Sequence, residues 1–239
     1  MTQPTYIVVS GTGTEIGKTM VTAALAALVR SAGARVGVAK PIQTGLLPGE
    51  EGDCQLAARM AGADAAFEHR RLIEALAPET AARRAGEAQA TVAELADAVR
   101  AWAEAPGAGL DVVVVEGAGG ILARLGTDTT ILDVARVLAA PVVLVTTPDL
   151  GTLSTTELAT RYLRDAGLEC LGLVLGTWPA APAEPTLAQR CNREDLPRLT
   201  GTPLVGALPD GAGRLAPDEF TTRAPEWFAP GFRDSLVAP

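Results

Sequence analysis

Cysteine, histidine and lysine are all scarce in this chain of 239 residues, and the first two scarcities exclude whole classes of site. The three cysteines, Cys54, Cys170 and Cys191, are widely spaced, which predicts reduced thiols that pack as small hydrophobic groups. Such spacing favours neither a disulfide framework nor a zinc site. The only histidine, His69, lies in a charged run, where we expect it to face solvent. A catalytic triad or a zinc centre built on histidine is therefore not expected.

Long apolar runs and a basic surface are also missing. No apolar stretch approaches the roughly 20 residues that cross a bilayer, and residues 1–15 lack the pattern of a signal peptide. The net charge is −8 without a basic stripe, which argues against a nucleic-acid partner. Because 48% of the residues are hydrophobic and 20% charged, we expect a globular, cytoplasmic protein that binds neither nucleic acid nor membrane.

Lysine is scarce although basic residues as a whole are not, because almost all of them are arginine. Lysine and arginine number 20 together, yet only Lys18 and Lys40 are lysine. Lysine offers a compact, rotatable charge where arginine offers a planar fork. Both lysines follow predicted strands, in loops punctuated by glycine or proline. We interpret them as two sites that need a compact cation, the alternative being a bias of composition.

Apolar strands alternate with amphipathic helices along the chain. A capping box at Thr91 and Glu94 opens one helix, and we take Trp102 on its apolar face as a packing residue. Strands are predicted at 6–9, 36–39, 111–115, 142–145, 171–175 and 204–207, and helices at 20–29, 56–60, 91–102, 130–138, 154–164 and 186–199. This alternation predicts a parallel sheet with helices on both faces, within one α/β domain over residues 1–239.

Three segments of the chain carry no such pattern. Residues 64–90 are rich in alanine and arginine and receive no assignment, and residues 178–185 form a predicted proline-rich surface loop. The tail after Pro209 has no clear periodicity, so its structure is left open.

A glycine-rich segment, Gly11 to Thr19, joins the first strand to the first helix. Backbone N–H groups of such a loop close around phosphate oxygens, and the start of the helix adds positive potential. Lys18 would reach the β- and γ-phosphates, and the Thr19 hydroxyl would bind Mg²⁺. The loop is a variant, because Thr12 stands where the strict pattern has glycine. The alternative is a turn that only caps the helix.

Two further motifs fall where ligands bind in parallel sheets, at the carboxyl ends of strands. Lys40 opens the sequence KPIQTG, and it would stabilise charge in phosphoryl transfer if the first two strands are neighbours. Glu116 ends the most apolar strand and precedes a run of small residues, as a carboxylate that binds Mg²⁺ does. Asp53 is either a second such acid or a helix cap.

The segments GTGTEIGKT at 11–19, KPIQTG at 40–45, GDCQ at 52–55, VEGAGG at 115–120 and DLGTLS at 149–154 together resemble the dethiobiotin synthetases. The resemblance runs from residue 5 to about 209. It implies a P-loop NTPase-like fold and a homodimer. The implied reaction turns 7,8-diaminononanoate and CO₂ (or bicarbonate) into a carbamate, which ATP activates as a mixed anhydride. The second amine then closes the ureido ring, and ADP and phosphate leave.

The resemblance also implies site residues. Lys18 and Lys40 would be catalytic, and Mg²⁺ would be held by Thr19, Asp53 and Glu116. The nucleotide would contact Thr14, Glu15, Ile16, Gly17, Lys18, Thr19, Met20, Asp53, Glu116, Gly117, Ala118, Gly119, Gly176, Thr177, Pro209, Asp210 and Gly211. The diamine or carbamate would contact Thr12, Lys40, Thr44, Gly119, Leu150, Gly151 and Ser154.

This chain departs from the family's pattern at two positions. Gly176 stands where the family has an asparagine that reads the base, so the nucleotide is ATP or another triphosphate such as CTP. Ser154 stands where asparagine is usual in holding the substrate's tail. One competing interpretation is an ATPase switch of the ParA and MinD type, although Gly13 occupies the position of its signature lysine. A second is an amidoligase-type synthetase, which usually carries a glutaminase domain that we do not expect to fit within 239 residues. A third is a nucleotide-binding regulator that has lost its activity.

Overall fold

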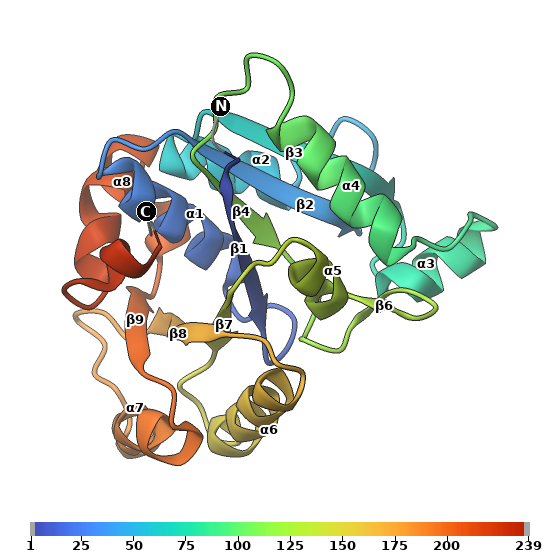
Figure 1. Ribbon diagram of the computed structural model, residues 1–239. Helices are drawn as coiled ribbons and strands as arrows, with labels where there is room; N and C mark the ends of the chain where they lie inside the picture. Colours follow the sequence, from blue (N-terminus) through green and yellow to red (C-terminus); the bar gives the residue numbers. More distant parts are fainter. Residues whose placement is uncertain (1–2, 237–239) are drawn as a thin grey trace.

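A seven-stranded sheet with the order β3-β2-β4-β1-β7-β8-β9 forms the centre of the molecule (Figure 1). Every pairing within it is parallel, which confirms the predicted α/β class. The computed structural model describes residues 3–236; residues 1–2 and 237–239 of the predicted domain lie outside the described part. The strands are β1 (Thr5–Gly11), β2 (Val36–Thr44), β3 (Ala65–Leu72), β4 (Val112–Glu116), β7 (Val142–Thr146), β8 (Cys170–Trp178) and β9 (Leu204–Pro209), beside a separate hairpin of β5 (Arg124–Gly126) and β6 (Thr129–Thr130).

Helices cover both faces of the sheet, and each face has its own apolar core. The helices are α1 (Lys18–Arg30), α2 (Asp53–Ala61), α3 (Pro78–Ala85), α4 (Val92–Ala103), α5 (Ile131–Val137), α6 (Thr152–Asp165), α7 (Leu187–Thr200) and α8 (Pro217–Arg223). Helices α1, α2 and α8 bury side chains on one face, and α3 to α7 on the other. Strand β4 contributes to both cores because its side chains alternate between the two faces of the sheet. Val112 and Val114 face the core beneath α1, and Val113 and Val115 face the core on the opposite side. Each such valine contributes roughly 1.5–3 kcal/mol when it is buried.

The unassigned segment 64–90 holds an edge strand and a helix. Strand β3 escapes notice in the sequence because its charged residues are only partly covered, which leaves no apolar alternation. The expectation that His69 faces solvent was wrong. Its ring is half-buried in β3, where it stacks near Phe67, and its Nε2 atom lies 3.0 Å from Oε1 of Glu94.

Strand β2 continues well past its predicted end. It extends to Thr44, so Lys40 lies inside a strand and the prediction of a loop there was wrong. Pairing with β4 ends at Ala39, and beyond it only β3 accompanies the strand. A proline is tolerated where a strand is paired on one side only, and Pro41 stands in that stretch.

Helix α6 begins earlier than predicted. Gly151, with φ of 95°, is its N-cap, and Ser154 lies within the first turn, so the predicted cap at Ser154 was wrong. The reason lies in a buried set of hydroxyls. The Oγ1 atom of Thr152 lies 2.8 Å from that of Thr146 on β7, and this contact draws the chain into the helix two residues sooner.

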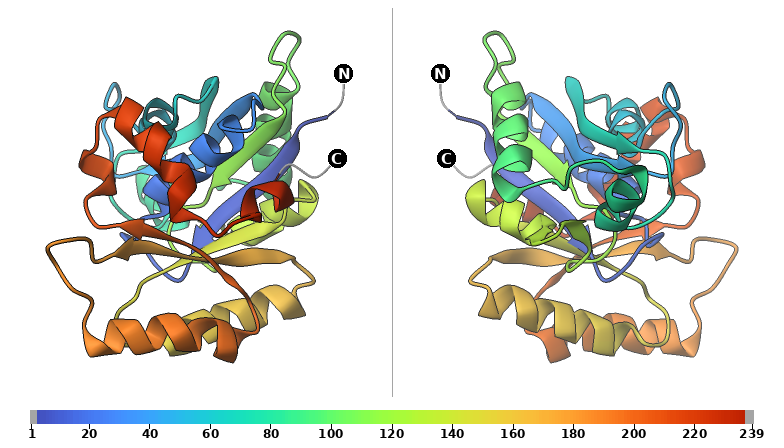
Figure 2. Two further views of the ribbon diagram at one scale, coloured as in Figure 1. Left: turned by 90° about the vertical axis from the view of Figure 1, so that its left-hand side faces the viewer. Right: turned by 90° about the vertical axis from the view of Figure 1, so that its right-hand side faces the viewer.

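The tail after Pro209 forms three short 3₁₀ turns, η1 (Ala212–Arg214), η2 (Ala224–Trp227) and η3 (Phe232–Ser235), together with α8. Figure 2 shows this segment lying against α1. Phe220 is fully buried there, and the ring of Trp227 packs edge-on against it at 5.1 Å between centroids. The segment thereby completes the core around α1. Within residues 3–236, none of the helices is both long and apolar enough to cross a membrane.

Candidate functional site

Four of the five predicted motifs meet at the carboxyl edge of the sheet, around a cavity of about 1060 Å³, and the motif at 149–154 does not line it. The glycine-rich loop, the end of β2, the start of α2 and the loop after β4 all contribute to it. Its lining includes Thr14, Glu15, Gly17, Lys18, Thr19, Met20, Lys40, Gln43, Thr44, Asp53, Glu116, Ala118 and Gly119. Residues 75–78, which lead into α3 and which no sequence pattern singled out, also line the cavity, so five separate segments of the sequence share one site.

The glycine-rich loop turns directly into α1. Gly17 is the N-cap with φ of 90°, a conformation that glycine adopts without strain, and it places Lys18 first in the helix. The Lys18 ammonium is 7% exposed and donates a hydrogen bond of 2.5 Å to the carbonyl of Gly13. Burial lowers the pKa of Lys18 to about 8, although Glu116 opposes the shift. Lys18 is thus a desolvated cation at a helix N-terminus, which suits it to a phosphate group.

Lys40 is buried and pairs with two acids, of which Glu116 is buried and Asp53 is partly exposed. Its Nζ atom is 2.8 Å from Oε1 of Glu116 and 2.7 Å from Oδ2 of Asp53, and it donates a 3.1 Å hydrogen bond to the carbonyl of Gly117. Burial alone would lower the pKa of Lys40, but the two carboxylates raise it above its usual value. Lys40 therefore stays protonated inside the protein, at 3% exposure.

The two lysines are joined through β4. We expected Lys40 to lie beside the phosphate site if the first two strands were neighbours. They are not neighbours, because β4 lies between β1 and β2. Glu116, at the tip of β4, accepts a 3.0 Å hydrogen bond from the hydroxyl of Thr19 and also binds Lys40. One carboxylate thereby links the phosphate loop to β2.

The oxygens of Thr19, Asp53 and Glu116 suit a hard divalent ion, which prefers hydroxyl and carboxylate ligands. The second carboxylate oxygen of Glu116, Oε2, is buried and has no hydrogen-bond partner within residues 3–236. A buried oxygen without a partner is costly, and a cation would satisfy it. Asp53 is the first residue of α2, after the N-cap Gly52, so its carboxylate faces the site and is not itself the N-cap.

Gln43 has a role that the sequence analysis did not assign, although it lies within KPIQTG. This buried side chain accepts a 2.9 Å hydrogen bond from the backbone N–H of Asp53 and donates one of 3.0 Å to the carbonyl of Thr44. Because Gly52 offers no side chain for capping, Gln43 satisfies the start of α2 from a neighbouring strand. Only the packing of α2 on β2 reveals that role.

Gly176, which was predicted to contact the nucleotide base, is packed so closely that no side chain would fit there. A Cβ atom on Gly176 would stand 1.8 Å from the carbonyl oxygen of Ile16, and one on Gly17 would stand 2.5 Å from the carbonyl oxygen of Gly176. Position 176 thus offers only its backbone to a ligand. Four other residues were predicted to contact the base, and they lie at the ends of β8 and β9: Thr177, Pro209, Asp210 and Gly211. None of the four lines the large cavity. The N–H of Asp210 donates a hydrogen bond to the carbonyl of Trp178.

The predicted substrate residues fall into two groups. Lys40, Thr44 and Gly119 line the cavity, whereas the other four do not. The Thr12 hydroxyl donates to Oγ1 of Thr146 at 3.4 Å. The remaining three stand at the start of α6, where the Leu150 side chain is 85% exposed; these are Leu150, Gly151 and Ser154.

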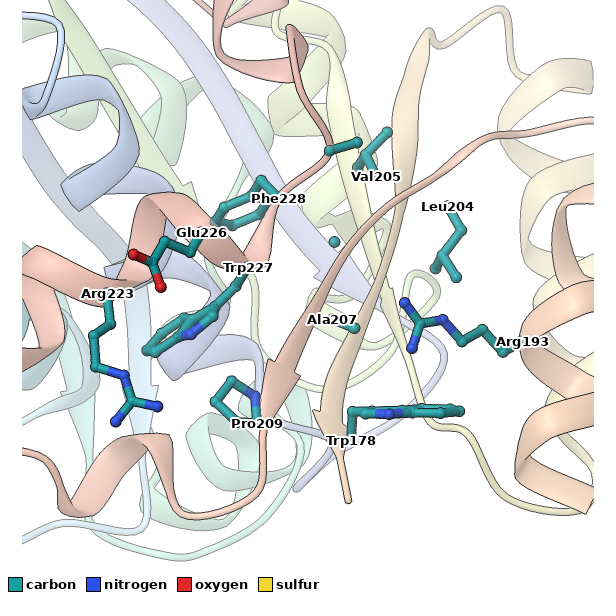
Figure 3. Close-up of a pocket in the computed structure, with 12 residues that line it drawn as sticks. Trp178, Arg193, Leu204, Val205, Ala207, Pro209, Arg223, Glu226, Trp227 and Phe228 are labelled. Carbon is teal, nitrogen blue, oxygen red and sulfur yellow. The ribbon is translucent and has the colours of Figure 1, made fainter. Parts of the chain in front are cut away.

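A second cavity, of about 500 Å³, borders the edge strand β9 (Figure 3). The guanidinium of Arg193 lies over the ring of Trp178 at 4.6 Å from its centroid, and Trp227 stands across β9 from this pair. Pro209 is the one predicted site residue in the lining.

A parallel sheet, a glycine-rich loop ending in Lys18 and Thr19, and an acid at the tip of the adjacent strand together define the class of P-loop nucleotide-binding α/β proteins. Solved structures agree. The cell division ATPase MinD of Pyrococcus furiosus has a TM-score of 0.52 at 20% identity, over 93% of this chain and 89% of its own. A ParA family ATPase from Chlorobium tepidum has a TM-score of 0.55 at 12% identity, over 99% and 97%. At such identities the likeness is one of fold.

Sequence comparison is more specific. A family model described as an AAA domain matches residues 5–213. The ATP-dependent dethiobiotin synthetase BioD of Streptomyces coelicolor is 51% identical over 94% of this chain and 92% of its own length. The synthetase of the same name from Rhodococcus jostii is 50% identical over 93% and 94%. This chain belongs to the ATP-dependent dethiobiotin synthetase family, which confirms the resemblance seen in its motifs.

Proposed function

We propose that this protein is an ATP-dependent dethiobiotin synthetase, a ligase of biotin biosynthesis that carboxylates 7,8-diaminononanoate with CO₂ and closes the ureido ring. The observation that carries the proposal is the convergence of Lys18, Lys40, Thr19, Asp53 and Glu116 on one cavity, in a chain that is half identical to named synthetases. ADP and phosphate are the other products.

The difficult step is phosphoryl transfer to a weak carbamate nucleophile. Such transfer depends on positioning and on neutralising phosphate charge, and it needs little covalent help from the protein. Lys18 would hold the β- and γ-phosphates from the start of α1. Lys40 would stabilise the charge that develops between the carbamate and the γ-phosphate. The buried setting of both ammonium groups strengthens these interactions, because water screens them poorly there.

Thr19, Asp53 and Glu116 would hold Mg²⁺. When bound, the ion supplies positive charge to the phosphate oxygens. Their hydroxyl and carboxylate oxygens support this assignment, as does the buried Oε2 of Glu116. The backbone of residues 117–119, which follow that acid, would border the transferred phosphate and the carbamate.

At position 176 only backbone groups would be available to contact the base of the nucleotide. An asparagine there would give adenine an amide partner, whereas Gly176 gives none. We therefore propose a triphosphate of either base class, ATP or CTP. The residues at the ends of β8 and β9 would border the base.

The proposed binding site for the substrate's tail lies next to the proposed dimer interface. The start of α6 would meet the tail at Leu150, Gly151 and Ser154, next to a partner subunit. Leu158 and Tyr162 on the same helix are 68% and 45% exposed, and an apolar strip of this kind supports an interface between two copies. The single domain and the cytoplasmic location stay predictions.

The test measures phosphate release with Mg²⁺ and each of ATP, GTP and CTP, with and without diaminononanoate and bicarbonate. We expect release that depends on the diamine, with a product of the mass of dethiobiotin. Release at the same rate without the diamine would instead favour an ATPase switch. The nucleotide series decides the base preference.

A further inference from the structure

The Lys40 ammonium is bound by the same carboxylates that are proposed to hold Mg²⁺. Its Nζ atom lies 2.7 Å from Asp53 and 2.8 Å from Glu116, so one cation bridges two acids that come from different elements. Lys40 and Glu116 are almost completely buried, at 3% and 1% exposure. Water therefore screens the pair of Lys40 and Glu116 poorly, whereas the Asp53 side chain is 34% exposed and remains open to the cavity.

We propose that Lys40 and the divalent ion compete for Asp53 and Glu116, so that binding of the ion transfers the Lys40 ammonium to the phosphate side of the cavity. The inference rests on the metal ligands of the proposed function. It adds that Lys40 holds the two acids together before the metal does, and that metal entry releases the lysine to act.

Competition follows from distance and charge. Mg²⁺ binds oxygen at about 2.1 Å, so an ion on Oε1 of Glu116 or Oδ2 of Asp53 would stand beside the ammonium in a low-dielectric site. Like charges repel strongly there. One ammonium also leaves the pair of carboxylates with a net negative charge, which attracts a divalent ion more than a monovalent one.

The buried Oε2 of Glu116 is a carboxylate oxygen that Lys40 does not occupy. It has no hydrogen-bond partner within the described residues, whereas Oε1 accepts from both Lys40 and Thr19. Oε2 of Glu116, Asp53 and the Thr19 hydroxyl would hold the ion, which would take the place of the ammonium as the cation that pairs the two acids.

Lys40 can move without any change in the backbone. Strand β2 is paired with β3 on both sides of Lys40, which fixes the Cα atom. Lys40 has four rotatable side-chain bonds and lines the same cavity as Lys18, so we expect side-chain rotation alone to carry the ammonium from the acids toward the phosphates. Its remaining contact is the 3.1 Å hydrogen bond to the carbonyl of Gly117, a neutral partner that holds the ammonium less strongly than the two acids do.

The test measures Mn²⁺ binding to the full-length protein by electron paramagnetic resonance, without nucleotide, so that phosphate and catalysis play no part. We expect Lys40→Met to bind Mn²⁺ about tenfold more tightly than the wild type, because the competing cation is gone. Lys40→Arg keeps a cation at the site and should stay near the wild-type affinity. Lys40→Gln, which keeps hydrogen-bond donors for the two acids, provides a second neutral variant should Lys40→Met fold poorly.

Lys18→Met is the matched control. Lys18 donates to the carbonyl of Gly13 and makes no ion pair with the acids, so its removal should raise Mn²⁺ affinity far less. Equal affinity in Lys40→Met and the wild type would overturn the proposal. An equal gain in both lysine variants, or no Mn²⁺ binding in any variant, would overturn it too. The proposed function fails separately, if wild-type phosphate release ignores the diamine.

Discussion

Replacing Gly176 by alanine tests the packing of the phosphate loop against β8. The added Cβ atom would lie 1.8 Å from the carbonyl oxygen of Ile16 and 2.9 Å from Cγ1 of Val145, where ordinary contact begins near 3.4 Å. Something must therefore move by more than 1 Å. Overpacking of this kind costs about 1–3 kcal/mol.

The loop should move rather than the strand. Strand β8 is paired along its length with β7 and β9, whereas the loop between β1 and α1 contacts the sheet beside it through Thr12, whose N–H donates to the carbonyl of Val145 on β7. Displacing Ile16 shifts Gly17, and with it the helix start that carries Lys18. A hydrogen bond to a charged group contributes about 1.5–3 kcal/mol, so the loss of one phosphate contact should lower nucleotide affinity at least about tenfold in Gly176→Ala.

Isothermal titration with ATP and CTP measures the affinity, and thermal unfolding measures the stability. The matched control is Gly13→Ala in the same loop, where the nearest atom to a new Cβ is 3.8 Å away, so its melting temperature should not change. If Gly176→Ala binds both nucleotides as the wild type does, the contact between Gly176 and Ile16 does not exist as described and the reasoning is refuted.

Four further outcomes are expected. Because the pKa of Lys18 is about 8 and phosphate contact would raise it, nucleotide affinity should fall as the pH rises through 8, by up to about tenfold per unit; Lys18→Arg, always charged, should lose that slope, and a persisting slope would contradict the assignment. Lys40→Gln should abolish phosphate release while nucleotide binding stays measurable, and unchanged turnover would remove Lys40 from the mechanism. Gln43→Leu should cost about 1 kcal/mol of unfolding free energy in urea, since the start of α2 loses its acceptor; unchanged stability would deny Gln43 that role. Phe220→Ala should cost about 3–5 kcal/mol in the same assay, and a loss below 1 kcal/mol would show that the tail is not packed as described.

The parts of this fold that could be predicted share one property: their signal is local. The central strands are continuous apolar runs because both faces are covered, and the run before Glu116 shows this most clearly. The glycine-rich loop ending in Lys18 and Thr19 likewise needs only its own sequence. Asp53 was left open between two roles because the choice depends on whether α2 faces the cavity.

The errors arose where neighbours decide the structure. Pro41 suggested a loop, but a strand with a partner on only one side accepts a proline. The order of strands placed β4 between the two lysine-bearing segments, which no local pattern shows. Gln43 and Gly176 matter only through what they touch, an N–H group of α2 and the carbonyl of Ile16. Such contacts come from the assembly of the sheet and not from its pieces.

The packing of residues 212–236 against α1 has a consequence for synthesis on the ribosome. The helix that presents Lys18 is translated early, yet the aromatic side chains that shield its outer face are translated much later. The nascent chain therefore carries α1 without its aromatic cover until residues 212–236 have been made, although α2 and the first strands can already pack against it. Apolar surface exposed in this way favours aggregation, so the last part of this core forms only when the tail arrives.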